Sequence, residues 1–212
     1  MLPNKPYSIS ALSLAIVLAL SACHREVKPA PEFKRSEYNK IVISNAVEPS
    51  TLDPQKSSDM AAGASIRQRM DGLVSTDAEG KTIPALALKW ESSDEGRVWT
   101  FHLRDANWSN GDPITAEDFV YSFRRLADPA TAAPNSSYLE DAKIQGAAEI
   151  LQGKAKPDTL GVKALDKKTL QFTLTAPVPY FPDMLIQQFT YPVHRATVEK
   201  FGEKWTQPGN YV

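Results

Sequence analysis

Residues 108–122 read WSNGDPITAEDFVYS, which combines a tight turn with the start of an amphipathic helix. The turn is Asn110-Gly111-Asp112-Pro113, whose residues favour a change of chain direction. Thr115 and Asp118 follow at the spacing of a capping box, in which the cap residue and the third helical residue satisfy each other's polar groups. Apolar side chains then recur at helical spacing, at Phe119, Phe123 and Leu126. The sequence therefore predicts a helix from about residue 116 to Asp128-Pro129, with one buried face.

Patterns typical of strands lie on both sides of this helix. Trp99, Phe101 and Leu103 alternate with polar residues, so one side of that strand is expected to be buried. Residues 161–165 and 169–174 flank a polar turn at 166–168, which predicts a hairpin. Further expected elements are a strand at residues 41–43 and helices at 61–73, 141–151, from Asp183 onwards and 196–201. Helices and antiparallel strands are intermixed without strict alternation, so we expect a mixed α and β fold (α+β).

The N-terminal residues have the pattern of an exported lipoprotein. Lys5 precedes an apolar run at 11–20, which is short for a membrane span and suits a signal peptide. Leu20-Ser21-Ala22-Cys23 resembles a bacterial lipobox, so residues 1–22 are expected to be removed and Cys23 to carry the lipid. The alternative is an ordinary secretory signal that contains a cysteine. Residues 23–37 combine prolines with alternating charges and are expected to form an extended tether.

Charge balance and cysteine usage exclude several classes of function. The chain has 24 Lys and Arg against 25 Asp and Glu, without a basic stripe that carries interleaved aromatic residues. Nucleic acid is therefore not an expected partner. Cys23 is the only cysteine, which leaves no thiol for catalysis or for an internal disulfide.

The sequence contains no recognisable catalytic or metal-binding motif. His24, His102 and His194 lie far apart and none has a partner at metal-ligand spacing. The paired carboxylates at 117–118 and 140–141 are expected to favour helix starts instead of acting as acid and base. The tryptophans are expected to pack in the core instead of lining a sugar site. We therefore expect no enzymatic activity, no cofactor and no metal.

Several runs together resemble the signature region of the family 5 extracellular solute-binding proteins. They are EPSTLDP at 48–54, VWTFHLR at 98–104 and the turn and helix start at 108–122. PVPYF at 177–181 and EKFGEKWTQPGN at 199–210 are similar to the oligopeptide-binding branch of that family. The resemblance implies a periplasmic-binding-protein type II-like fold, in which two lobes close on an extended peptide whose main chain pairs with the protein as an added strand.

The resemblance also places candidate ligand-binding residues. Ser58, Asp59 and Met60 occupy the segment that pairs with the peptide backbone, so an extended main chain there is expected to matter more than the side chains. Without the resemblance, an ordinary loop ahead of a helix is the simpler interpretation. Asn135 occupies a position where the family has a tyrosine, which puts an aromatic contact at that edge of the cleft in doubt.

Applied to the whole chain, the resemblance predicts domain boundaries, a function and binding partners. Residues 38–70 are expected to form the first part of lobe I, 71–192 a small α/β domain II, and 193–212 a return into lobe I. Family members are more than twice as long, so the chain is expected to be an N-terminal fragment that lacks the second large lobe. The expected function is oligopeptide capture in the periplasm or at the cell envelope, for an ABC permease. A monomer anchored to the membrane by lipid is expected.

Two alternatives stay open from the sequence. One is a surface lipoprotein that uses the same fold as an adhesin or scaffold. The other is a relative that binds heme, dipeptides or murein peptides. The choice among peptides is expected to depend mostly on the missing lobe.

The lipobox generates the first testable prediction. Cys23→Ser should abolish acylation, because the thiol that accepts the lipid is gone, and should release the protein or its precursor from lipidated membrane fractions. Incorporation of radiolabelled palmitate measures this directly. Label in the Ser variant would contradict the lipobox assignment.

Overall fold

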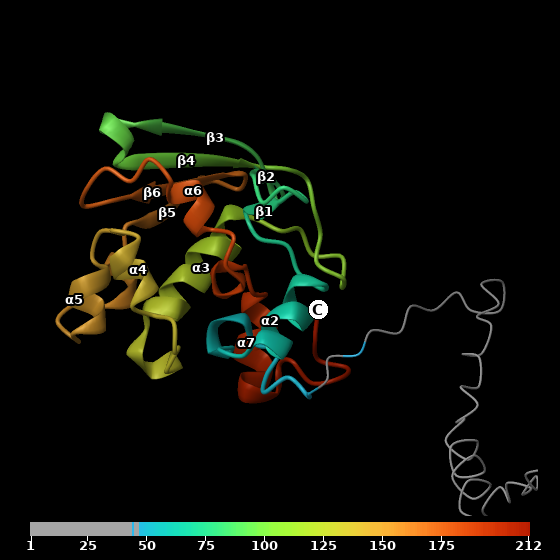
Figure 1. Ribbon diagram of the computed structural model, residues 1–212. Helices are drawn as coiled ribbons and strands as arrows, with labels where there is room; N and C mark the ends of the chain where they lie inside the picture. Colours follow the sequence, from blue (N-terminus) through green and yellow to red (C-terminus); the bar gives the residue numbers. More distant parts are fainter. Residues whose placement is uncertain (1–43, 45–46) are drawn as a thin grey trace, which may run out of the picture. The chain divides into compact units, whose positions relative to one another are not determined.

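The computed structural model describes residue 44 and residues 47–212 (Figure 1). The signal peptide, Cys23, the tether and the strand expected at residues 41–43 all lie outside the described residues.

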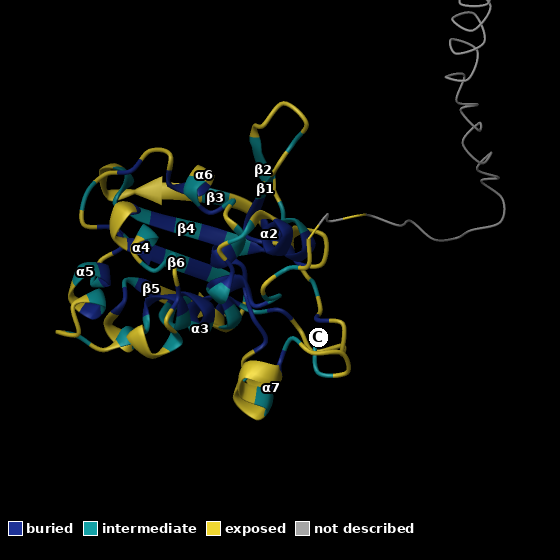
Figure 2. Ribbon diagram, turned by 60° about the horizontal axis from the view of Figure 1, so that its bottom comes forward, coloured by how far each residue is buried: buried dark blue, intermediate teal, exposed yellow. Residues whose placement is uncertain are grey.

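A four-stranded antiparallel sheet forms the centre of the fold. Its strands are β3 (Ala87–Ser93), β4 (Val98–Leu103), β5 (Val162–Asp166) and β6 (Thr169–Thr173), in the order β3-β4-β6-β5. The alternation expected for β4 is confirmed: Trp99, Phe101 and Leu103 are buried and the residues between them are half-buried. Figure 2 shows the buried surface concentrated along β4 and β6, with β3 more exposed at the edge. The hairpin expected around residues 166–168 is also confirmed as β5 and β6.

Both edge strands of this sheet are irregular. The register of β3 against β4 shifts between Ala87 and Lys89, and that of β5 against β6 shifts between Ala164 and Asp166. Leu88 and Leu165 lie at these two shifts and are exposed. A second, two-stranded sheet pairs β1 (Val74–Thr76) with β2 (Thr82–Pro84).

Helix α3 (Ala116–Ala127) packs against the sheet, as the apolar spacing predicts. Phe119, Phe123 and Leu126 are each at most 1% exposed. Phe123 meets Phe172 of β6 edge to face, with ring centroids 4.9 Å apart. The predicted capping box is present, and the Asp118 carboxylate accepts the Thr115 backbone N–H at 2.8 Å. Figure 1 shows α3, α4 and α5 on the same side of the sheet.

The other elements are short. The α-helices are α2 (Met60–Arg67), α4 (Tyr138–Asp141), α5 (Ala147–Leu151), α6 (Phe181–Met184) and α7 (Arg195–Phe201). The 3-10 helices are η1 (Pro54–Lys56), η2 (Asp94–Gly96), η3 (Pro129–Thr131), η4 (Pro157–Thr159), η5 (Gln188–Thr190) and η6 (Gly202–Lys204). The helices expected from Asp183 and at 196–201 correspond to α6 and α7, although α6 begins two residues earlier than Asp183.

The helix expected at residues 61–73 is too long. Helix α2 ends at Arg67, although Ile66, Met70 and Leu73 are all buried as the spacing suggested. Gly72 lies against the Tyr191 ring, where an added Cβ would sit 2.6 Å from Cε1. The carbonyl of Leu73 accepts the N–H of Ala87 at 2.9 Å, which draws the chain into strand pairing. Long-range contacts therefore end the helix earlier than apolar periodicity indicates.

The helix expected at residues 141–151 is divided into α4 and α5. Lys143 and Gly146 have positive φ angles of 59° and 82°, which an α-helix does not accommodate. Between them, Gln145 exchanges backbone hydrogen bonds with the hairpin: its N–H donates to Thr173 at 2.9 Å and its carbonyl accepts from Gly161 at 2.8 Å. The non-helical residues between α4 and α5 thus connect both helices to the sheet through Gln145.

No helix among the described residues is both long and apolar enough to cross a membrane. No group of three or more His, Cys, Asp or Glu side chains in the same residues is arranged to hold a metal ion.

The packing of α3 generates the second prediction. Phe123→Ala should lower the free energy of unfolding by roughly 3–5 kcal/mol, because it removes a fully buried ring, whereas Thr115→Ala should cost about 1 kcal/mol through the cap. Denaturant unfolding of both variants measures the difference. A larger loss for the Thr115 variant would show that the buried face of α3 is misplaced.

Candidate functional site

The segment from Ser57 to Met60 changes abruptly from buried to exposed. Ser57 is fully buried, and its hydroxyl donates to the carbonyl of Pro54 at 3.0 Å. Ser58 is exposed, and Met60, at the first position of α2, is 88% exposed. Asp59 between them has an extended backbone, with φ −102° and ψ 157°. The extended conformation expected for the whole segment is therefore found at Asp59 and is wrong for Met60, which is already helical.

The side chain of Asp59 has a structural role that the sequence interpretation missed. Its carboxylate accepts the N–H of Ala62 at 2.7 Å and so caps α2. It also accepts hydrogen bonds from the hydroxyl and the N–H of Ser50. The Ser50 hydroxyl and the Ala62 N–H both hold the pKa of Asp59 below its usual value. The identity of this side chain consequently matters for the shape of the segment, whatever its main chain binds.

Asn135 lies next to this segment, although 75 or more residues separate them in sequence. Its side-chain amide donates to the carbonyl of Ser57 at 3.0 Å. The structure thus brings together the four residues expected to bind ligand, with Asn135 bonded to the residue that precedes Ser58. No aromatic side chain is available from position 135 itself, as the sequence indicated.

Asp53, which lies just before the Ser57–Met60 segment in the chain, forms a buried ion pair with Arg125. The Asp53 carboxylate, in a residue only 4% exposed, accepts two hydrogen bonds from Arg125 of α3, at 2.9 and 2.5 Å. The indole N–H of Trp205 donates to the same carboxylate at 3.0 Å, and the backbone N–H of Gln55 donates at 3.1 Å. Both oxygens of this buried charge are therefore satisfied, which is the condition for a buried ion pair to be tolerated.

Gln55 extends this network to another part of the chain. Its side-chain oxygen accepts from Arg125 at 2.5 Å, and its side-chain nitrogen donates to the carbonyls of Tyr191 at 3.0 Å and Phe189 at 3.4 Å. The residue is fully buried. Hydrogen bonds thus connect residues 53–57 to α3, to η5 and the adjoining Tyr191, and to Trp205.

Sequence reasoning did not identify Arg125, Gln55 or Trp205 as parts of this arrangement. Arg125 and Trp205 lie 72 and 152 residues from Asp53, so no local spacing relates them. One signal was available, because Asp53 in the run Leu-Asp-Pro has the residue type and position of an N-cap. That signal predicts the bond to Gln55 but not the ion pair.

Comparisons with known proteins agree with this arrangement of elements. Residues 81–212 match the model of the bacterial extracellular solute-binding proteins, family 5 Middle. The chain is 48% identical over 178 residues to the periplasmic oligopeptide-binding protein OppA of Escherichia coli, which covers 84% of this chain and 33% of that protein. It is 43% identical over 178 residues to the periplasmic murein peptide-binding protein MppA of the same organism, with the same coverage.

A solved structure shows the same similarity in three dimensions. The crystal structure of Haemophilus influenzae OppA in complex with RPPGFSPFR superposes with a TM-score of 0.77 at 45% identity, covering 79% of this chain and 33% of that one. The chain spans about a third of the length of the curated relatives that it matches.

The buried ion pair generates the third prediction. Asp53→Asn should lower the free energy of unfolding by about 3–5 kcal/mol, because it leaves the Arg125 guanidinium buried without its counter-charge. Asp94→Asn is the control: it breaks the exposed ion pair with Arg97 and should cost at most about 1 kcal/mol.

A double variant tests whether the unpaired charge of Arg125 causes the loss of stability. Asp53→Asn combined with Arg125→Met should recover part of the lost stability, since no unpaired charge remains buried. Denaturant unfolding gives all three values. Equal losses at positions 53 and 94 would contradict the importance of burial.

Proposed function

Because the chain belongs to the bacterial extracellular solute-binding proteins of family 5, we propose that it contributes to capturing oligopeptides for an ABC importer. Both the family and the periplasmic-binding-protein type II-like fold expected from the sequence are confirmed. Its relatives are solute-binding proteins, and the proposed role is binding without catalysis.

The observation that carries this proposal is the segment Ser58–Met60, whose first and last residues are exposed and which directly follows the buried network around Asp53. As the first residue of α2, Met60 has an N–H without a partner inside the helix. Asp59, which immediately precedes Met60, has an extended backbone. An extended peptide can pair with such exposed main-chain groups regardless of its sequence, which suits a receptor for varied peptides. Asn135 lies at the side of this segment, where its bond to Ser57 holds the chain in place.

The relatives indicate the class of ligand. The H. influenzae structure holds the nine-residue peptide RPPGFSPFR, and the names of other relatives specify oligopeptides and murein peptides. We propose an oligopeptide ligand for this protein. We further propose that residues 38–70 and 193–212 belong to one lobe and 71–192 to a small domain beside it.

The proposal includes a location. Relatives of this chain are named as periplasmic proteins, which supports a place outside the inner membrane. We propose that lipid on Cys23 keeps the protein at the envelope as a monomer, close to the permease that receives its peptide.

The fourth prediction tests the main-chain role of Met60. Met60→Pro should keep α2, because proline is well tolerated at the first helical position and the preceding Asp59 is extended, but it removes the Met60 N–H. Met60→Ala is the matched control, since it keeps that N–H and removes the exposed side chain. Peptide binding should be lost in the Pro variant and retained in the Ala variant.

NMR titration with tri- to pentapeptides measures this, because binding to this chain alone is expected to be weak. Each exposed backbone hydrogen bond contributes about 0.5–1.5 kcal/mol against an association cost of at least about 4 kcal/mol. Shifts should be confined to residues 58–60 and Asn135 and should not saturate below millimolar peptide. Micromolar binding, or equal loss in both variants, would contradict the proposed pairing.

A further inference from the structure

Asn107 lies in a sequence motif that the proposed function does not use. Residues 105–109 read DANWS, in which the asparagine is followed two positions later by a serine and the residue between them is not proline. This Asn-x-Ser pattern is the acceptor motif for transfer of an oligosaccharide to asparagine in exported proteins. The bacterial form of the motif also has a carboxylate two positions before the asparagine, and Asp105 supplies it.

The motif lies on one side of a short hairpin that ends in an exposed turn. Asn107 forms an antiparallel bridge with Pro113, and the N–H of Trp108 donates to the carbonyl of Asp112 at 2.8 Å. Alternate residues of such a pair face opposite sides. Trp108 is accordingly buried, at 8% exposure, and residues 109–113 are all exposed. The three residues of the motif are exposed as well: Asp105, Asn107 and Ser109.

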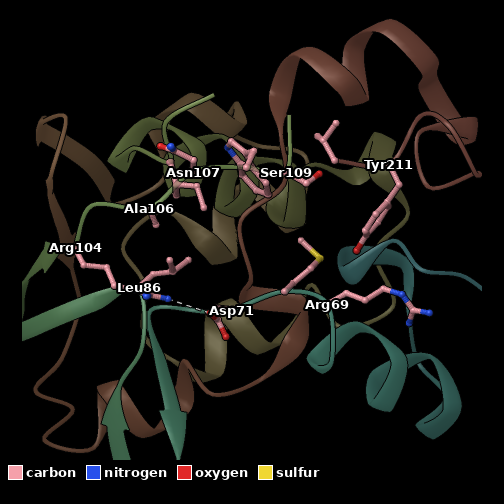
Figure 3. Close-up of a pocket in the computed structure, with 12 residues that line it drawn as sticks. Arg69, Asp71, Leu86, Arg104, Ala106, Asn107, Ser109 and Tyr211 are labelled. Carbon is pink, nitrogen blue, oxygen red and sulfur yellow. Dashed lines mark hydrogen bonds and ion pairs between the residues drawn. The ribbon is translucent and has the colours of Figure 1, made fainter. Parts of the chain in front are cut away.

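The side chains of the motif have few other partners. Among the described residues, no hydrogen bond engages the amide of Asn107 or the hydroxyl of Ser109. Figure 3 shows both residues on the same side of a cavity that they help to line. Asp105 pairs with Lys168 at 3.2 Å, but its side chain is fully exposed, and such a pair is weak. An enzyme that recognises these three groups therefore meets little competition from the protein itself.

A second Asn-x-Ser run, at residues 135–137, lacks these properties. Ala133 stands where the bacterial motif has its carboxylate. The amide of Asn135 is half-buried and donates to the carbonyl of Ser57 at 3.0 Å. The fold thus presents one of the two asparagines to solvent and keeps the other bonded within the protein.

We propose that Asn107 is an acceptor for a bacterial oligosaccharyltransferase, which transfers an oligosaccharide to it from a polyprenyl diphosphate. The amide nitrogen Nδ2 attacks the anomeric carbon of the donor's first sugar and forms the new C–N bond. The bond from that carbon to the diphosphate oxygen breaks, and the lipid diphosphate leaves with the electron pair. A proton of the amide passes to a base of the transferase.

This modification in the cell rests on the proposed location outside the inner membrane, where such transferases act. The ability of the folded chain to serve as an acceptor does not rest on that location, nor on peptide capture at Met60. A reaction with purified components therefore tests the acceptor by itself.

The fifth prediction concerns the purified chain, incubated with a purified bacterial oligosaccharyltransferase and its lipid-linked oligosaccharide. A single glycan should be added, and mass spectrometry of peptides should place it on Asn107. Asp105→Asn and Ser109→Ala should each lower the rate about ten-fold or more, the value of one hydrogen bond to a charged group. Asp105→Glu and Ser109→Thr are the matched controls and should still be modified, because they keep the carboxylate and the hydroxyl.

A synthetic peptide of residues 103–111 separates the contribution of the sequence from that of the fold. The folded chain and the peptide should both be modified, and Asn135 should stay unmodified in the folded chain. Modification of the peptide alone would overturn the proposal, because the fold would then withhold Asn107 from the enzyme. Absence of modification in both, a similar yield of glycan on Asn135, or an unchanged rate in the Asp105→Asn variant would overturn it as well.

Discussion

The buried carboxylate of Asp53 is the interaction on which the arrangement of the described chain depends. Placing a charge in the interior is costly unless every lone pair is used, and here Arg125, Trp205 and the Gln55 N–H use them. These partners come from the N-terminal part, from α3 and from the C-terminal part of the described chain. One charge thus joins three segments that are distant in sequence, directly before the exposed residues Ser58 and Met60.

The candidate site combines buried polar side chains with main-chain groups at an exposed segment. This combination explains how the site can accept peptides of varied sequence while its own geometry stays fixed. The residues that determine its geometry are Asp53, Gln55, Asp59 and Asn135, and each is occupied by bonds within the protein. What remains for a ligand is mostly main chain, which distinguishes peptides poorly by sequence. Recognition of a particular peptide sequence would have to come from groups other than this main chain.

The sequence predicted those features that arise from neighbouring residues. The periodicity of Phe119, Phe123 and Leu126 was sufficient for α3, and the alternation around Phe101 was sufficient for β4. The end of α2 and the break between α4 and α5 were not predictable in this way, because Tyr191 and Thr173 act on them from distant positions. For the site, resemblance supplied Ser58–Met60, whereas the capping by Asp59 and the ion pair with Arg125 needed coordinates.

The irregular edge strands have a consequence for behaviour in concentrated solution. A sheet with two open edges offers unpaired N–H and C=O groups to neighbouring molecules, and exposed leucines at Leu88 and Leu165 would strengthen such contacts. The register shift at each leucine interrupts the regular spacing that an incoming strand requires, and Lys89 and Asp166 place a charge beside it. Fibre-like stacking of copies through these edges is thereby disfavoured.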